Sequence, residues 1–179
     1  MENQVEKDWI QQSLAGNQEA FEHLVERYQR MMHALAFRMT GSVADAEDVA
    51  QEVFVQAYQQ LGSYRGEAKF SSWLYQIGVN RCLNWKKKIA RREHVYEQFG
   101  AEQSPAAPAT DLAEKVQQAL LQLDPQQRSA IILTVYDEMS HAEAARILGC
   151  SEATVSWRVF KARKQLKRWL EADKGEPTQ

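Results

Sequence analysis

The chain has 179 residues, of which 44% are hydrophobic and 26% charged, a balance typical of a globular protein and too apolar for a fully disordered one. The longest apolar runs, among them Ala130–Leu133, are far too short to cross a membrane, and no basic segment followed by an apolar one marks a signal peptide. Cys82 and Cys150 lie far apart in a chain with four histidines, which argues against a disulfide scaffold or zinc site and favours a reducing cytoplasm.

The formal net charge is −2, but the charges are unevenly distributed. Residues 1–70 carry six basic and eleven acidic side chains, whereas residues 71–97 carry six basic and two acidic ones. Residues 151–179 carry seven basic and four acidic side chains. Because salt screens charges beyond about 8–10 Å, a phosphate responds to a local patch more than to the total. Two basic segments with interleaved aromatic residues favour nucleic-acid contact at two places, the alternative being solvated helix faces.

Helical periodicity dominates the chain, since Gly and Pro are few and no strand pattern competes. Apolar residues at helical spacing predict a helix over residues 17–39, which the segment Thr40-Gly41-Ser42 ends. Ser42 is the predicted N-cap of a second helix, which runs to about Leu61 and has acidic residues in its first turn. Opposite the apolar stripe of this second helix, an acidic and amide ridge surrounds one valine, and we regard it as a candidate protein-docking surface: Asp48, Gln51, Glu52, Val55 and Gln59.

A third long helix is predicted from near Ser71 to about Gln98, after a loop over residues 62–66. Its surface is apolar apart from one polar stripe, which consists of Gln76, Asn80, Asn84 and Lys87. Amides can bond base edges, aromatic rings can stack on unpaired bases, and the cations towards Gln98 can hold phosphates. The helix is therefore a candidate nucleic-acid surface, the alternative being that its aromatic residues Trp73 and Tyr75, with Ile77, belong to a core.

The composition changes after this helix. Residues 100–110 are small, polar and Pro-containing, which predicts a flexible linker over residues 99–111. Helical periodicity resumes at Asp111, and the pair Asp124-Pro125 begins a helix predicted over residues 126–138. The predicted fold is therefore all-α with two small helical domains, divided as follows: residues 1–98, the linker 99–111, residues 112–170 and a disordered tail over 171–179.

The most specific motif is a helix-turn-helix over residues 140–168. Ser140 and Glu143 match a capping box, Gly149 suits the turn, and Ser151 caps the second helix. Cys150, at this turn, is assigned to packing and not to redox sensing. The second helix has a predicted buried stripe and an opposite aromatic and basic face, as a major-groove helix requires. That face comprises Trp157, Phe160, Lys161, Lys164 and Arg168, with Arg158 and Arg163 on its flanks.

Taken together, these segments resemble an extracytoplasmic-function (ECF) RNA polymerase sigma factor, the smallest form of the bacterial housekeeping-type sigma family. The resemblance spans residues 17–170 and is carried by four segments in family order: Asp45–Tyr58, Phe70–Tyr75 with Asn80, Leu123–Arg128 and Ala153–Arg163. It implies a protein without catalytic activity or cofactor, which binds core RNA polymerase, directs it to promoters and nucleates melting. The two helical domains would then be sigma region 2 and sigma region 4.

The resemblance also implies roles for individual residues. The acidic and amide ridge would dock on the clamp helices of the polymerase largest subunit. The non-template strand of the −10 element would be captured by Tyr64, Phe70, Trp73, Asn80, Asn84, Lys87 and Lys88. The −35 duplex would be read by Ser156, Trp157, Phe160 and Lys161, with Arg158, Arg163 and Lys164 completing the DNA surface. The implied partners are therefore core RNA polymerase, promoter DNA and an anti-sigma factor.

Two other functions are alternatives. A freestanding helix-turn-helix regulator with an N-terminal sensor bundle would bind its promoter tightly without polymerase, as a dimer, and would leave the acidic ridge unexplained. A nucleic-acid hydrolase would need clustered metal-binding carboxylates or a nucleophile beside a base. The one dense acidic cluster, Asp45, Glu47 and Asp48, is already explained by the first turn of a helix.

Overall fold

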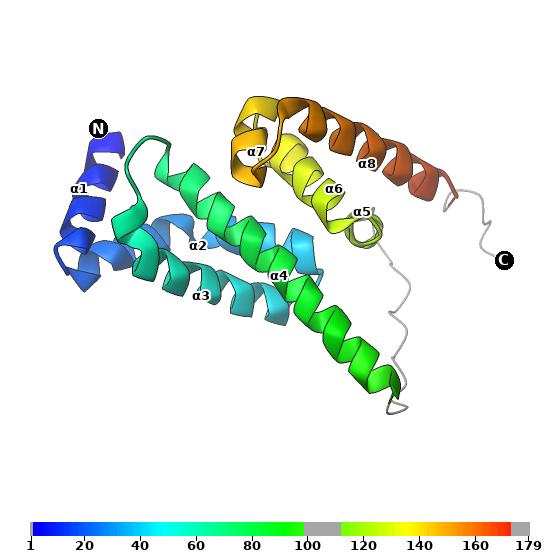
Figure 1. The fold of residues 1–179 in the computed structure, drawn as a ribbon, viewed down its shortest axis with the longest axis horizontal. Coiled ribbons are helices and arrows are strands. Elements are labelled where there is room, and N and C mark those ends of the chain that lie inside the picture. Colours follow the sequence, from blue (N-terminus) through cyan, green and yellow to red (C-terminus); the bar gives the residue numbers. More distant parts are fainter. Residues whose placement is uncertain (1, 99–111, 173–179) are drawn as a thin grey trace.

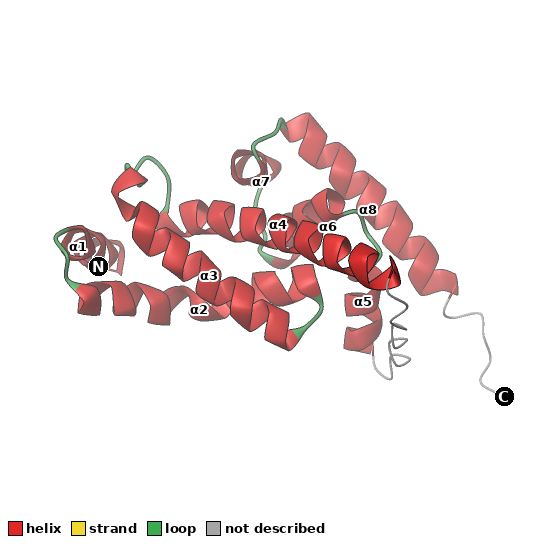
Figure 2. Cartoon of the chain, turned by 60° about the horizontal axis from the view of Figure 1, so that its bottom comes forward, coloured by secondary structure: helices red, strands yellow, loops and turns green. Residues whose placement is uncertain are grey.

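The computed structural model describes the backbone of residues 2–98 and 112–172 and the side chains of residues 4–85 and 112–171. Within these ranges the regular elements are helices joined by short loops, and no strand occurs (Figure 2). The described helices all lack the combination of length and hydropathy that a membrane span requires. The all-α prediction is confirmed.

The helices form two groups, α1 to α4 and α5 to α8, which lie against each other (Figure 1). The first group consists of α1 (Glu2–Leu14), α2 (Gln18–Thr40), α3 (Val43–Gln60), the 3₁₀ turn η1 (Leu61–Ser63) and α4 (Phe70–Gln98). The second consists of α5 (Leu112–Leu121), α6 (Pro125–Ile131), the π-helical turn η2 (Ile132–Tyr136), α7 (His141–Leu148) and α8 (Glu152–Ala172). The predicted elements therefore occur in the predicted order, within two or three residues at most ends.

Three features differ from the sequence predictions. Helix α1 was not predicted, because its weak apolar stripe is completed only by packing against α2. The helix predicted over residues 126–138 is α6 followed by η2, and it ends at Tyr136. The predicted disordered tail was wrong at its start, because α8 continues to Ala172; the rest of that tail and the predicted linker lie outside the described residues.

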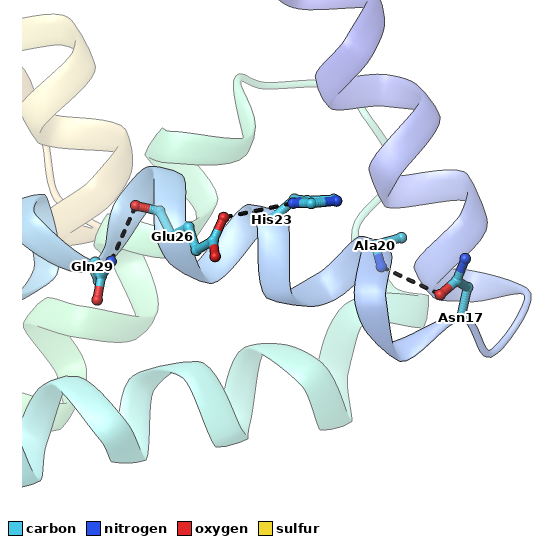
Figure 3. A network of polar contacts seen from close by, with 5 residues as sticks. All are labelled: Asn17, Ala20, His23, Glu26 and Gln29. Carbon is cyan, nitrogen blue, oxygen red and sulfur yellow. Dashed lines mark hydrogen bonds and ion pairs between the residues drawn. The ribbon is translucent and has the colours of Figure 1, made fainter.

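Local capping fixes where α2 and α3 begin. The Asn17 side-chain oxygen accepts a hydrogen bond from the Ala20 N–H at 3.3 Å, and further along α2 His23 Nδ1 lies 3.6 Å from Glu26 Oε2 (Figure 3). Ser42 Oγ accepts from the Asp45 N–H at 3.2 Å, so the predicted N-cap of α3 is confirmed. Each cap satisfies a backbone donor that the first turn leaves without an intrahelical partner.

The core of the first domain lies where α4 crosses α2. Gly78 permits this close approach, since a Cβ there would lie 2.9 Å from Leu35 Cδ2 and 3.2 Å from Met32 Sδ. Fully buried side chains from three helices fill the space around this crossing: Leu24, Met32, Leu35, Met39, Val49, Val53, Phe70 and Leu74. Tyr75 and Ile77 are also buried, so the core alternative holds for these two residues.

Cys82 belongs to this core, with no solvent exposure, and burial raises the pKa of its thiol to about 12. Because only the thiolate is nucleophilic, we expect Cys82 to resist alkylation by iodoacetamide at pH 8 in the native protein. Cys150, which is only half-buried, is expected to react first. Mass spectrometry of the labelled peptides checks this order, and denaturant should make both thiols react; faster labelling of Cys82 in the native protein would contradict it.

A buried arginine joins the two domains. Arg128 is 1% exposed, and its guanidinium donates to backbone carbonyls at the end of α5: Leu120 O at 2.7 Å, Leu123 O at 3.0 Å and Leu121 O. It also donates to Met39 O, in the last turn of α2, at 2.6 Å. The guanidinium thus donates to backbone carbonyls at the C-terminal ends of α5 and α2, one helix in each domain. The helix dipole favours a cation at such an end.

Further contacts hold the domains together beside Arg128. Gln117 Nε2 of α5 donates to Phe37 O of α2 at 3.1 Å, and the Arg38 guanidinium lies 4.5 Å from the centre of the Tyr136 ring. Helix α7 also packs along α4. In both views α6 lies between α4 and α8, so α8 is on the far side of the second domain from α4 (Figure 1, Figure 2).

Candidate nucleic-acid interface

The helix-turn-helix has the predicted local geometry. The Glu143 N–H donates to Ser140 Oγ at 3.2 Å and the Ser140 N–H donates to Glu143 Oε2 at 3.0 Å, which confirms the capping box. Gly149 ends α7 with a φ of 59°, in the left-handed region that favours glycine. Ser151 Oγ accepts from the Thr154 N–H at 3.2 Å and so caps α8. These contacts fix the angle at which α8 leaves α7.

Helix α8 has the predicted buried and exposed faces. Val155, Val159 and Ala162 are buried against α6 and α7. On the opposite face the side chains of Trp157 and Phe160 are 55% and 63% exposed. Lys161 Nζ lies 5.6 Å from the centre of the Trp157 ring, within cation–π range. Two large aromatic rings in water beside exposed cations form a surface that suits a base edge and a phosphate backbone.

The other predicted residues of α8 differ in what they contact. Arg163 and Lys164 are exposed, as is Ser156, whose Oγ lies 2.8 Å from His141 Nδ1. Arg158 is half-buried: its guanidinium donates to Gln126 Oε1 of α6 and, at 3.5 Å, to Cys150 Sγ. The Arg158 side chain is thus held against the domain in this structure, and it orients α8 on α6.

A cavity of about 430 Å³ lies beside the start of α4, between the loop that precedes this helix and α7. Its wall includes Tyr64, Lys69, Trp73 and Gln76 from the first domain and Glu143 and Arg146 from α7. The ring centres of Tyr64 and Trp73 are 5.5 Å apart. Aromatic rings next to a lysine and an amide are groups that could hold an unpaired base and its phosphate.

Phe70 supports this cavity from behind. Its ring is 1% exposed and its centre lies 5.4 Å from the ring centres of both Tyr64 and Trp73. Tyr64 Oη donates to Ala68 O at 2.7 Å, which closes the loop before α4 on itself. Of the three predicted aromatic residues, Tyr64 and Trp73 line the cavity, and Phe70 is buried behind them.

The polar stripe of α4 continues from the cavity. Gln76, Asn80 and Asn84 are exposed, as predicted from their spacing. Lys87 and Lys88 were also predicted to contact nucleic acid, but their side chains lie outside the described residues. The stripe thus offers amide groups, which can both donate to and accept from base edges, in a line away from the aromatic rings.

The candidate docking surface lies on α3. All five predicted residues, Asp48, Gln51, Glu52, Val55 and Gln59, line one broad hollow of about 680 Å³. Val55 is 58% exposed at this surface. Arg81 of α4, which the sequence analysis did not single out, borders the same hollow and forms an ion pair with Glu52 at 3.3 Å.

Several contributors were missed from sequence. Lys69 and Arg81 were not singled out because each is a single residue without a distinctive spacing. Tyr28, whose ring contacts Phe70, was assigned only to the apolar stripe of the helix predicted over residues 17–39. The positions of all three depend on how α2, α3 and α4 pack. Among the described side chains, no group of three or more His, Cys, Asp or Glu is arranged to hold a metal ion.

Comparison with known proteins matches both domains. The family model for Sigma-70 region 2 matches residues 24–92, and that for Sigma-70, region 4 matches residues 113–166. Over 179 aligned residues the chain is 34% identical to the ECF RNA polymerase sigma factor SigW of Bacillus subtilis, covering 92% of this chain and 96% of that protein.

Two solved structures resemble the whole fold. CnrH, in complex with the cytosolic domain of CnrY, matches with a TM-score of 0.71 and 29% identity, covering 94% of this chain and 99% of that one. The sigma factor RpoE of Bartonella quintana, in complex with the anti-sigma factor NepR, matches with a TM-score of 0.71 and 26% identity, covering 86% and 98%.

Proposed function

Because this chain belongs to the ECF RNA polymerase sigma factor family, we propose that it binds core RNA polymerase, directs it to specific promoters and nucleates promoter melting. It has no enzymatic activity of its own. The observation that carries the assignment of surfaces is that the exposed aromatic and basic face of α8 belongs to the second domain, whereas the aromatic rings of the cavity beside α4, Tyr64 and Trp73, belong to the first. One chain can therefore contact two parts of a promoter.

The duplex contact is assigned to α8. With the helix in the major groove, Trp157 and Phe160 would meet base edges and methyl groups, while Lys161, Arg163 and Lys164 would neutralise phosphates. This is the proposed −35 contact. This contact positions the complex on the DNA and does not favour melting.

The −10 contact is assigned to the cavity and the polar stripe of α4. A base that leaves the duplex would stack on Tyr64 or Trp73, with Lys69 near its phosphate, and Asn80 and Asn84 would meet the following bases. Since a ligand shifts an equilibrium only through its preference between the two states, capture of an unpaired base favours melting. Stacking contributes about 1–3 kcal/mol per base.

That energy sets how far the protein alone can open DNA. Stacking in the duplex averages about 1.4 kcal/mol per step. Opening several base pairs therefore loses more stacking free energy than the capture of one base supplies. The protein thus nucleates the opening, and the polymerase must supply the rest. This is why we propose docking through the α3 surface, on the clamp helices of the largest polymerase subunit, as part of the same mechanism.

The proposed partners include an anti-sigma factor, supported by the similarity to RpoE, which was solved with the anti-sigma factor NepR. Because polymerase and promoter are in the bacterial cytoplasm, that is the proposed location. A sigma factor in this role needs no cofactor.

Run-off transcription tests the proposal. The template is a promoter fragment recovered from polymerase-bound DNA in cells that overexpress the chain. We expect specific transcripts with the protein and core polymerase together, and none with either alone. A freestanding regulator would instead bind that fragment tightly without polymerase, and this result would contradict the proposal.

Phe160→Ala is expected to weaken binding of polymerase-bound protein to the −35 duplex about tenfold, the loss of one good base contact. The ring is 63% exposed and packs little in the free protein, so the fold should not change. Trp169→Ala, on the same helix with a 38% exposed ring, is the matched control and should bind as wild type. Fluorescence anisotropy with labelled duplex measures both, and equal losses in the two variants would argue against the α8 assignment.

A further inference from the structure

Helix α1 lies outside the matched Sigma-70 region 2 segment, residues 24–92, and brings one acidic side chain into the first domain. Glu6 is 9% exposed although it carries a carboxylate. Its Oε2 accepts a hydrogen bond from the Tyr28 hydroxyl of α2 and lies 3.6 Å from Arg27 Nε. This buried carboxylate fixes the Tyr28 side chain, because breaking their hydrogen bond would leave a buried polar group unsatisfied.

Tyr28 connects this carboxylate to the aromatic cavity. Its ring centre lies 5.6 Å from that of Phe70, and Phe70 in turn contacts Tyr64 and Trp73 at 5.4 Å each. Burial and the hydrogen bond to Glu6 raise the pKa of Tyr28, so the hydroxyl stays protonated and remains a donor. Burial and, after it, the charge of Glu6 raise the pKa of Tyr64 as well.

We infer that Glu6 is a positioning residue for strand capture: through its hydrogen bond it holds the Tyr28 ring against Phe70, and Phe70 holds Tyr64 and Trp73 in their places on the cavity wall. Helix α1 thereby contributes to promoter opening without touching DNA. The inference rests on the proposed function, since it needs the cavity to bind an unpaired base.

The alternative is that the Glu6–Tyr28 bond only attaches α1 to α2. The two interpretations differ in what a broken bond affects. If Glu6 positions the cavity, single-strand capture falls while duplex binding and polymerase binding are kept. If the bond is only structural, thermal stability falls, and all three binding activities change together or stay unchanged.

The experiment uses the full chain bound to purified bacterial core polymerase. The probe is a single-stranded oligonucleotide that the wild-type complex enriches from a random pool, labelled with 2-aminopurine so that a base leaving its neighbours is seen by fluorescence. We expect Glu6→Ala to weaken capture about tenfold, with −35 duplex and polymerase affinities unchanged. Glu6→Gln keeps an acceptor for the Tyr28 hydroxyl and should stay within about twofold of wild type.

Two further variants keep the test decisive. Tyr28→Phe retains the ring, loses only the hydroxyl and should reproduce the loss, and the double variant Glu6→Ala/Tyr28→Phe should be no worse than either single one, as expected for two groups in one bond. If Glu6→Ala fails to fold, Tyr28→Phe alone tests the inference. Asp8→Ala removes an exposed carboxylate from the same helix and should bind as wild type.

Wild-type capture in both Tyr28→Phe and Glu6→Ala overturns the inference, as does an equal loss of duplex binding or an equal loss in Asp8→Ala. If the wild-type complex itself fails to capture any oligonucleotide, the proposed function fails first and the inference with it. If the wild type captures the strand and only the Glu6 prediction fails, the proposed function stands.

Discussion

Val55→Asp is expected to raise the Kd for core RNA polymerase by roughly a hundredfold while leaving the fold intact. Val55 is 58% exposed, so the change removes little from the core of the free protein. On docking, the new carboxylate would be buried beside Asp48 and Glu52, in a hollow where Arg81 is already paired with Glu52. Burying an unpaired polar group costs about 2–3 kcal/mol or more, and each 1.4 kcal/mol is tenfold in affinity.

Val43→Asp is the matched control, because Val43 lies on the same helix with 57% exposure but outside the docking hollow. Fluorescence anisotropy with labelled polymerase measures both affinities, and circular dichroism verifies the fold. Substitution of Glu52 is a less direct probe, since it also breaks the ion pair with Arg81 at 3.3 Å. Equal Kd values for wild type and Val55→Asp would remove the docking assignment.

Arg128→Met is expected to lower the free energy of unfolding by about 3 kcal/mol or more. The substitution leaves buried carbonyls of α5 and of Met39 without a donor, and each such acceptor costs about 1–3 kcal/mol. Loss of the buried charge offsets part of this sum, because the guanidinium no longer has to be desolvated. Burial lowers the pKa of Arg128 to about 10, so it stays charged and the loss should be the same from pH 6 to 8.

Urea unfolding followed by circular dichroism measures this change. Arg163→Met, an exposed arginine in the same domain, should shift stability by less than about 0.5 kcal/mol. Since Arg128 contacts both domains, the destabilisation should also loosen their association, seen as faster hydrogen exchange at the end of α2. A stability unchanged by Arg128→Met would show that these carbonyls find other donors.

The sequence predicted the elements whose signals are local. The capping box of Ser140 and Glu143, the N-cap Ser42 and the buried stripe of α8 all follow from spacing along one helix, and the structure has each of them, except that Leu166, the last residue of the predicted stripe, is only half-buried. The exposure of Trp157 and Phe160 followed in the same way, because residues opposite a buried stripe face solvent.

What the sequence did not predict depends on contacts between distant segments. Helix α1 has too weak an apolar stripe to be recognised alone, and its place is fixed by contacts such as that of Glu6 with Tyr28. The resemblance implied that Arg158 belongs to the DNA surface, and its hydrogen bond to Gln126, 32 positions earlier, could not be predicted from one helix. Arg128 belonged to a family motif, but its contact with Met39 depends on how the domains meet.

Permanganate reactivity of thymines across a bound promoter tests most directly whether one chain holds paired DNA with α8 and opened DNA with the cavity beside α4. Reactive thymines are predicted at the −10 region only when protein and core polymerase are both present, with that reactivity lost in Trp73→Ala while −35 protection is kept. Thymines that react to the same extent with core polymerase alone, or a Trp73→Ala complex that opens the promoter as wild type does, would contradict the account.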